Sequence, residues 1–322
     1  MAEAPEQQNE RAGELRDTLR AHLAELSTEQ VGDEQLQLDL MPVAELVDAM
    51  NRANETVPAA VAAVAPAITR AIDGIVERMR GGGRLIYVGA GTAGRMGVLD
   101  ASEIPPTFGT DPSLVVGVIA GGLDAVGRAI ENAEDDLAAA VSDLTALSLT
   151  SDDAVVGISA SGRTPYVLSA LEHARGVGAF TVALACNADS EIGRAADVAI
   201  ETVVGPEFVT GSTRLKAGTA QKLVVNMLST ITMVRLGKVY GSLMVDLKAT
   251  NAKLRARSER TVMLATGVDA ATAARAIAEV DGWIKAAIVV AATGLSGPDA
   301  IALLAQHGGM LREALAALPV VE

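Results

Sequence analysis

Two loops rich in glycine and hydroxyl residues each follow a short apolar run, and both could bind an anion. They span residues 89–94 and 159–164. A glycine turn after a strand lets backbone N–H groups and a helix N-terminus approach an anion. An ordinary helix N-cap at one of the hydroxyls of the second loop is the alternative interpretation. Two such loops, each after a strand, lie at the same edge of one sheet, which favours a ligand crevice. The candidate binding residues are Gly91, Thr92, Ser159, Ser161, Gly162 and Thr164.

The first loop also matches the glycine pattern of dinucleotide-binding proteins, with glycines at 89, 91 and 94. A nicotinamide site of that kind calls for an acidic residue at the end of the second strand, where it contacts the ribose. Here that strand ends in Val118-Ile-Ala-Gly-Gly122, which carries no carboxylate. The sequence therefore disfavours a dinucleotide, and we expect no cofactor.

Two carboxylates near this edge could do acid–base chemistry. Glu103 is followed by Pro105-Pro106, which predicts that a helix ends there and leaves Glu103 at the end of an element. Glu134 falls on a helix predicted over residues 124–144, where a solvated charge is the simpler interpretation. The three histidines do not cluster with acids, and no Cys/His spacing suits a metal. Any catalysis is therefore expected to use carboxylates, without a metal.

Apolar runs alternating with helical periodicity indicate the elements that position these residues. We predict an α/β fold: a doubly wound, parallel five-stranded sheet, N-terminal helices and a small C-terminal helical domain. The expected domains are an N-terminal, partly mobile segment (1–40), an α/β domain (41–266) and the helical domain (267–322). The predicted strands are 84–88, 114–119, 154–158, 180–185 and 198–204. The predicted helices are 12–26, 42–80, 124–144, 164–175, 215–236, 245–266, 270–280, 283–292, 298–306 and 310–318.

Composition excludes several classes of partner. The chain of 322 residues carries a formal net charge of −14, which argues against nucleic acid or an anionic membrane as the main partner. The single cysteine, Cys186, allows no intramolecular disulfide and ends an apolar run, so a buried thiol is expected. The start of the chain lacks the apolar region of a signal peptide, and no run of 18 apolar residues occurs. A cytoplasmic protein is expected.

With both loops and both acids in view, the sequence resembles the N-acetylmuramic acid 6-phosphate etherase family, within the sugar-isomerase (SIS) fold. The resemblance runs from about Thr28 to the C-terminus, nearly the whole chain. Several long stretches in the right order are far more specific than a lone glycine motif. They are residues 55–58, 83–92, 97–109, 116–122, 159–166, 210–222 and 244–253.

The resemblance implies a substrate with a 6-phosphate and a lactyl ether at C3, and the products N-acetylglucosamine 6-phosphate and D-lactate. By position, the two catalytic glutamates of the family fall on Glu103 and Glu134. It implies elimination of lactate followed by addition of water, with Glu134 as the base at C2 and Glu103 as the acid near the lactyl oxygen. Glu103 is then expected in the drier, less cationic surroundings. Thr92, Ser159, Ser161 and Thr164 are implied to hold the substrate, mainly its phosphate.

The resemblance also implies a homodimer. Residues 215–236 could form part of the interface or simply belong to the core, and Lys216 could reach a substrate anion or only flank the start of that helix.

Three departures from the family pattern stand out. Ala93 replaces the usual serine of the first loop, Ile104 the usual cysteine, and residues 31–33 the usual Arg-Asn-Pro. Loss of the serine hydroxyl puts the affinity or the exact substrate in doubt. The alternatives are a sugar-phosphate-sensing regulatory protein without turnover, or a phosphosugar isomerase. The presence of both glutamates favours the enzyme, since sensing needs no acid–base pair and isomerisation needs no acid beside O3.

Overall fold

A computed structural model describes residues 26–32, 37–246 and 252–318 of the chain. The helix predicted over residues 12–26 lies almost wholly outside these ranges. The chain forms two compact units, one of residues 1–99 with 117–226 and one of residues 100–116 with 227–322. The division into functional domains at residues 40 and 266 stays a prediction.

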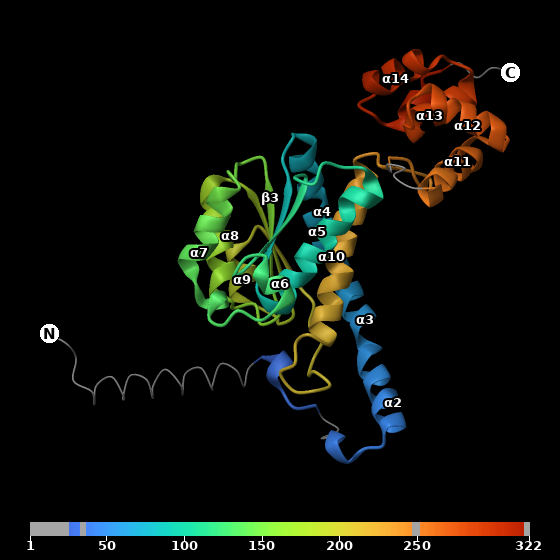
Figure 1. The fold of residues 1–322 in the computed structure, drawn as a ribbon. Helices are drawn as coiled ribbons and strands as arrows, with labels where there is room; N and C mark the ends of the chain where they lie inside the picture. Colours follow the sequence, from blue (N-terminus) through green and yellow to red (C-terminus); the bar gives the residue numbers. More distant parts are fainter. Residues whose placement is uncertain (1–25, 33–36, 247–251, 319–322) are drawn as a thin grey trace, which may run out of the picture. The chain divides into compact units, whose positions relative to one another are not determined.

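The predicted five-stranded sheet is confirmed, with strand order β2-β1-β3-β4-β5 (Figure 1). The pairs β1–β3, β3–β4 and β4–β5 are parallel. The chain crosses from β1 to β2 at one side and returns to β3 at the other, so the direction of winding reverses between β1 and β3. In open α/β sheets of this order, ligands bind outside the carboxyl ends of the strands at that reversal. The strands are β1 (Leu85–Gly89), β2 (Val115–Ile119), β3 (Ala154–Ser159), β4 (Phe180–Ala185) and β5 (Val198–Glu201).

Helices cover both faces of the sheet, which explains why the strands are continuous apolar runs. Every residue of β1 and β3 is buried. Figure 1 shows α8 (Pro165–Val177) and α9 (Glu191–Ala195) on one side of the sheet and α4 (Ala65–Arg80) on the other. The buried side chains of α4 recur with helical spacing: Ile68, Ala71, Ile72, Ile75, Val76 and Met79.

The helical region predicted over residues 42–80 is divided into three helices. They are α2 (Val43–Asn54), α3 (Thr56–Ala63) and α4, with breaks at Glu55 and Val64. Pro58 and Pro66 each lie in the first turn of α3 or α4. A proline there lacks only an N–H that a first turn leaves unbonded, but it cannot continue a preceding helix.

The prediction of one continuous helix over residues 124–144 is wrong. The structure has α6 (Asp124–Gly127), a 3₁₀ turn η3 (Ala133–Asp135) and α7 (Leu137–Ala146). Arg128 is extended, and Asn132 takes a left-handed conformation with φ 59°. Asp136 then starts α7 as its N-cap, because its carboxylate accepts a hydrogen bond from the Ala139 amide at 2.9 Å. Glu134 therefore lies on a turn between helices rather than on a regular helix.

The prediction that a helix ends at Pro105-Pro106 is also wrong. Helix α5 runs over Gly91–Phe108 and contains both prolines. They lie in its last turns, and the Gly109 amide donates to the Pro105 carbonyl at 2.9 Å. Because few backbone bonds remain beyond this point, the two missing amide donors cost little and the helix continues. Glu103 consequently lies within a helix.

Cys186 is buried directly after β4, as predicted. Burial raises the pKa of its thiol to about 12, so the thiol stays protonated at neutral pH. The strand predicted over residues 198–204 is shorter than expected and ends at Glu201.

A buried carboxylate joins the starts of β1 and β3. Asp153 accepts hydrogen bonds from the Arg84 amide at 2.9 Å, from Arg84 Nη2 at 2.7 Å and from the Thr150 amide at 3.0 Å. Burial alone would raise the pKa of Asp153. The bonds from Arg84 and Thr150 outweigh that effect and hold the pKa below its usual value.

We expect Asp153→Asn to lower the free energy of unfolding at neutral pH by about 2–3 kcal/mol. This loss is smaller than for a fully buried ion pair, because the Arg84 side chain is 24% exposed. The pKa of Asp153 is lower in the folded state than in the unfolded state. The stabilisation by its carboxylate is therefore complete above the unfolded-state pKa of about 3.9, and it disappears as the pH falls through the lower folded-state value. Urea unfolding at pH 7 and pH 3 measures the loss of stability in Asp153→Asn and its dependence on pH. The exposed neighbour offers the control Asp152→Asn; an equal loss in both variants would contradict the assignment.

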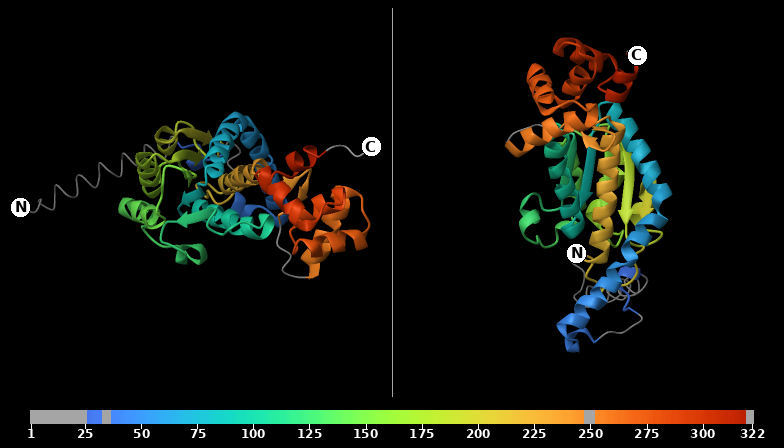
Figure 2. Two further views of the ribbon diagram at one scale, coloured as in Figure 1. Left: turned by 90° about the horizontal axis from the view of Figure 1, so that it is seen from above. Right: turned by 90° about the vertical axis from the view of Figure 1, so that its right-hand side faces the viewer.

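The second unit contains the C-terminal helices, and Figure 2 shows them (orange to red) gathered into one cluster. They are α11 (Ala252–Thr266), α12 (Ala270–Glu279), α13 (Ile284–Thr293), α14 (Gly297–Gln306) and α15 (Leu311–Ala316). The four predicted tail helices are confirmed to within three residues at each end. The helix predicted from residue 245 is wrong at its start, since Val245 and Asp246 are not helical. A short hairpin of β6 (Val239–Tyr240) and β7 (Leu243–Met244) was not predicted.

Asp246 is the polar centre of this unit. Its carboxylate contacts Lys285 Nζ at 2.7 Å and Lys238 Nζ at 3.1 Å, and it accepts from Trp283 Nε1 at 3.2 Å. The surrounding core is made of small and branched apolar side chains, among them Val262 and Ile288.

Within the described residues no single helix is long and apolar enough to cross a membrane. Two pairs of consecutive segments are long and apolar enough when taken together, but each pair is sharply bent at a short break. They are α2–α3 with α4, and α13 with α14.

Candidate active site

The two anion loops start beside each other in the structure. Gly89 of β1 pairs with Ile158 of β3, so the next residues along the two strands, Ala90 and Ser159, are neighbours. Adjacent strands lie about 4.8 Å apart. The loops therefore leave the sheet together, at the point where its winding reverses.

The first loop is held tight by glycines. A methyl group on Gly89 would lie 2.6 Å from the Gly94 amide, so only a residue without Cβ allows the strand and the start of α5 to approach this closely. Gly91 begins α5 with φ 53° and is exposed, and Thr92 behind it is half-buried. Ala93, which replaces the usual serine of the family pattern, is only 7% exposed.

The second loop gathers its three hydroxyls around Ser159. Ser159 Oγ lies 2.8 Å from Thr164 Oγ1 and 3.3 Å from Ser161 Oγ, and it accepts a hydrogen bond from the Gly162 amide at 3.0 Å. The clustering expected from the sequence is therefore present. Gly162 has φ 74°, and a methyl group there would lie 2.4 Å from Ser190 Cβ, so no other residue fits this turn.

The N-cap interpretation of this loop does not hold. Thr164 occupies the N-cap position of α8, yet its side chain makes no capping hydrogen bond. Its hydroxyl contacts Ser159 instead. The first-turn amides of α8, a helix of 13 residues, thus have no side-chain cap. An uncapped helix N-terminus beside three hydroxyls is a suitable environment for a phosphate.

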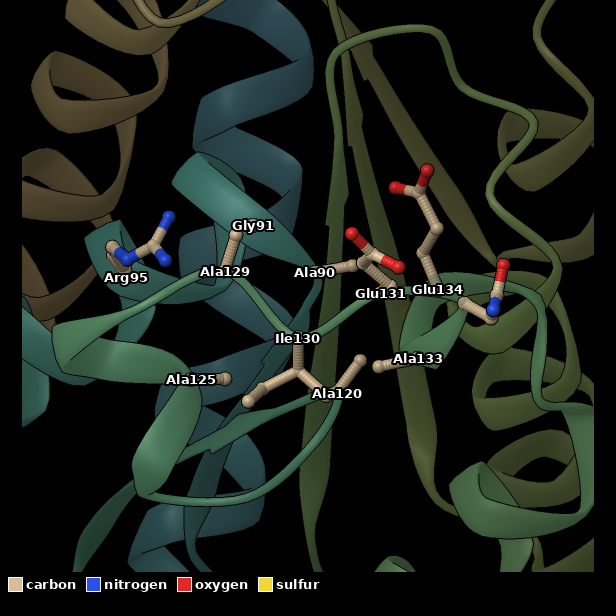
Figure 3. A pocket seen from close by; sticks show the side chains of 11 residues that line it. Ala90, Gly91, Arg95, Ala120, Ala125, Ala129, Ile130, Glu131, Ala133 and Glu134 are labelled. Atoms are coloured by element: carbon tan, nitrogen blue, oxygen red, sulfur yellow. The ribbon is translucent and has the colours of Figure 1, made fainter.

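A pocket of about 230 Å³ opens at the carboxyl ends of β1 and β2 (Figure 3). Ala90 and Gly91 of the first loop form one part of its wall, and residues 129–134 form another. Figure 3 shows the side chains of Glu131 and Glu134 projecting to the same side of the pocket. The structure therefore puts Glu134 on the wall of the pocket that the first anion loop also lines. Its side chain is exposed, as the solvated-charge interpretation expected, but it lies on a turn and not on a regular helix.

Arg95 holds this pocket wall in place. Its Nε donates to the Val126 carbonyl at 3.0 Å, and its Nη2 donates to the Arg128 carbonyl at 3.1 Å. The guanidinium thereby ties the C-terminal end of α6 to helix α5. Sequence reasoning missed both Arg95 and Glu131. Glu131 stands three residues before Glu134, but that spacing becomes informative only once the turn around Asn132 is known.

Glu103 lies on α5 in the second unit and is exposed. The dry environment expected for it is therefore absent from the described part of this single chain. Its helix is fixed nearby by Asp100, which is 4% exposed and accepts a hydrogen bond from Ser229 Oγ at 3.1 Å. Glu103 is therefore accessible to a ligand, and the hydrogen bond of Asp100 fixes the helix that carries it.

Lys216 is the first residue of α10 (Lys216–Arg235), and it is 5% exposed. Its Nζ lies 3.4 Å from Thr56 Oγ1. Burial lowers the pKa of Lys216, and the nearby Glu207 carboxylate raises it only in part. The Glu207 carboxylate accepts hydrogen bonds from the Lys216 amide at 2.8 Å and from the Ala217 amide at 3.0 Å. Glu207 therefore caps the N-terminus of α10. Sequence patterns do not reveal this cap, because Glu207 lies nine residues upstream of Lys216.

No three His, Cys, Asp or Glu side chains are grouped to hold a metal ion within residues 26–32, 37–246 and 252–318. The chemistry that the site residues can do is proton transfer by carboxylates and anion binding by hydroxyls, amides and Lys216.

Two domain models match the chain. The model of the glucokinase regulatory protein N-terminal SIS domain matches residues 67–175, and the SIS domain model matches residues 133–231. An N-acetylmuramic acid 6-phosphate etherase of Streptomyces avermitilis is 59% identical to the chain, over 94% of the chain and 97% of the relative. The chain belongs to the N-acetylmuramic acid 6-phosphate etherase family. Etherases of Streptomyces coelicolor (58% identity, 93% and 96% covered) and Mycolicibacterium smegmatis (53%, 92% and 99%) match over similar lengths.

Among solved structures, a phosphoheptose isomerase from Francisella tularensis matches with 18% identity and a TM-score of 0.46. The match covers 60% of this etherase-family chain and 98% of that one. Family membership confirms the resemblance seen in the sequence, and the SIS match agrees with the parallel sheet described above.

Proposed function

We propose that the chain cleaves the lactyl ether of N-acetylmuramic acid 6-phosphate to N-acetylglucosamine 6-phosphate and D-lactate, in the catabolism and recycling of cell-wall amino sugars. The observation that carries the proposal is the pocket at the carboxyl ends of β1 and β2, whose wall contains both Glu134 and residues 90 and 91 of the first anion loop. Membership in the etherase family gives the substrate.

The proposed reaction begins from the open-chain aldehyde of the sugar, in which the C2 proton is acidic. Glu134 removes that proton, a C2–C3 double bond forms, and the C3–O bond to lactate breaks. Glu103 donates a proton to the departing lactate oxygen. Water then adds its hydroxyl to C3, giving its proton to Glu103, and C2 takes a proton back. Each proton transfer by a placed carboxylate contributes roughly 10²–10⁴-fold to the rate.

The 6-phosphate is proposed to bind at the hydroxyl cluster. Ser159, Ser161 and Thr164 supply donors, and the uncapped N-terminus of α8 supplies amides and a favourable dipole. Thr92 and Gly91 complete the cradle from the neighbouring loop. Such a site binds an anion through local donors, in spite of the net charge of −14 of the chain.

Lys216 is proposed to contact an anionic group of the substrate, because its buried ammonium has only a neutral hydroxyl at 3.4 Å among its described hydrogen-bond partners. We expect Lys216→Met to raise KM about 10- to 100-fold with a smaller change in kcat, as for loss of one charge-assisted hydrogen bond. Since the pKa of Lys216 is lowered, the affinity of the wild type should decline with rising pH earlier than an ordinary lysine would allow. Steady-state kinetics from pH 7 to 10 measure both effects. Lys222→Met, at an exposed position of the same helix, is the control; an equal effect there would contradict the role.

A cytoplasmic homodimer is proposed from the resemblance to the family. Met227, Ile231 and Val234 are spaced along α10 by about one turn each and are 38–42% exposed, which supports an interface rather than a purely internal role for this part of the helix. A second subunit would also shield exposed side chains from water. Light scattering of the purified protein measures the mass.

The test of the proposed function is incubation of the purified protein with N-acetylmuramic acid 6-phosphate in ¹⁸O-water, followed by an assay for D-lactate. Lactate release with ¹⁸O located at C3 of the sugar product, apart from the exchangeable oxygen at C1, establishes C3–O cleavage. Saturable binding of the sugar phosphate without lactate would instead favour a sensing role, the alternative that the match to a regulatory-protein SIS domain keeps open. Ala93→Ser would then be the first variant to examine.

A further inference from the structure

A short N-terminal segment is fixed against the sheet edge through a buried threonine. The segment forms the 3₁₀ turn η1 (Ser27–Glu29), and Thr28 in its middle is 0% exposed. Its partner is Asn187, two residues beyond the end of β4 and 4% exposed. A buried hydroxyl and a buried amide both need hydrogen-bond partners, so this contact is a specific one.

The Asn187 amide connects Thr28 to the hydroxyl loop. Its Nδ2 donates to Thr28 Oγ1 at 3.1 Å and to the Ala160 carbonyl at 3.0 Å. Its Oδ1 accepts from Ser27 Oγ at 2.8 Å. Ala160 stands between Ser159 and Ser161, two of the three clustered hydroxyls. A chain of hydrogen bonds therefore runs from the N-terminal turn to the backbone that carries the anion-binding side chains.

The same turn is close to the segment that leads into Lys216. A methyl group on Gly211 would lie 2.8 Å from Glu29 Oε2, so the Glu29 side chain rests directly on this glycine. Gly211 has φ 74°, which favours glycine independently of the contact. Residues 27–29 thus contact Asn187, which bonds to the hydroxyl loop, and Gly211, which lies five residues before Lys216.

We propose that Thr28 and Asn187 are positioning residues, which hold the Ser159–Thr164 loop in its phosphate-binding geometry. This inference rests on the proposed function, since it concerns the same anion site. Thr28 accepts one of the two Asn187 N–H bonds, and its loss leaves a buried amide proton unbonded next to Ala160. The loop can then shift to satisfy that amide, which misplaces the hydroxyls of Ser159 and Ser161.

The matched pair Thr28→Val and Thr28→Ser tests the proposal, because valine keeps the shape and serine keeps the hydroxyl. We expect Thr28→Val to raise KM for N-acetylmuramic acid 6-phosphate roughly 10-fold with kcat within about 2-fold, and Thr28→Ser to stay close to wild type. Calorimetric binding of N-acetylglucosamine 6-phosphate should weaken by the same factor. That binding needs no turnover, so a chain that released no lactate would fail the proposed function and still test this inference.

Two results would overturn the inference. One is wild-type affinity in Thr28→Val. The other is an equal loss of affinity in both variants together with an equal drop of the urea midpoint, which is the behaviour of a purely structural residue. Should Thr28→Val not fold, Ser27→Ala removes the bond to Asn187 Oδ1 from a half-buried position and should weaken binding roughly 3-fold. Unchanged binding in Ser27→Ala would then count against the proposal.

Discussion

Glu134→Gln is expected to lower the rate of lactate release roughly 10²- to 10⁴-fold, because the amide cannot take the C2 proton. The same variant should also stop exchange of the C2 hydrogen with deuterium in solvent, since both processes begin with that proton. NMR of the sugar in ²H₂O measures exchange, and an enzymatic assay measures lactate. Binding of N-acetylglucosamine 6-phosphate should stay near that of the wild type, because Glu134 lies in the pocket wall and not in the hydroxyl cluster.

Glu131→Gln is the matched control for this prediction. Glu131 has the same side chain, lines the same pocket and projects to the same side of it (Figure 3). The resemblance to the family assigns the base to Glu134, so Glu131→Gln should keep most of the exchange and most of the lactate release. If Glu131→Gln lost the exchange while Glu134→Gln kept it, the base would be Glu131. Loss in both variants would indicate that the two carboxylates act together.

Glu103→Gln is expected to separate the two halves of the reaction. Lactate release should fall roughly 10²- to 10⁴-fold, because the departing oxygen has no acid to protonate it. Exchange of the C2 hydrogen should continue, because Glu134 is intact and the carbanion can only return its proton. Retained exchange without elimination is a result that general unfolding cannot produce.

The control for this second prediction is Glu313→Gln, which changes an exposed glutamate on α15 (Leu311–Ala316) in the same unit. It should leave both rates unchanged. Lactate release at the wild-type rate in Glu103→Gln would refute the acid assignment. Loss of exchange and elimination together would move the base role to Glu103. Because Glu103 is exposed in the single chain, a bound substrate or a second subunit is needed to exclude water from it.

The sheet was predictable because its signals are local. Five apolar runs separated by helical stretches gave the strands, and β4 matches its predicted bounds. Both anion loops followed from the same pattern, since a loop after a parallel strand lies at a known edge. The four tail helices were found because glycines and prolines separate them in the sequence.

The errors arise where a contact distant in sequence decides the local structure. Pro105 and Pro106 are helix breakers by propensity, but they fall in the final turns of α5, where few bonds are lost. Residues 129–135 have the composition of a helix, yet Arg95 binds the carbonyls of Val126 and Arg128 just before them, and the segment turns instead. The Glu207 cap on α10 and the Asn187 link to Thr28 depend on packing that no window of sequence reveals.

The separation of Glu134 from the sheet has a consequence for how such a protein can evolve. The residue is carried on a short exposed peptide between α6 and α7 that the Arg95 guanidinium fastens to α5. The hydroxyls for the phosphate belong to a different loop and are fixed by their own bonds. Exchange of this peptide would therefore alter the acid–base group while the strands and the hydroxyl cluster of the second loop keep their own hydrogen bonds. Descendants of one ancestral sheet could in this way acquire a reaction, or lose it and keep only recognition of the ligand.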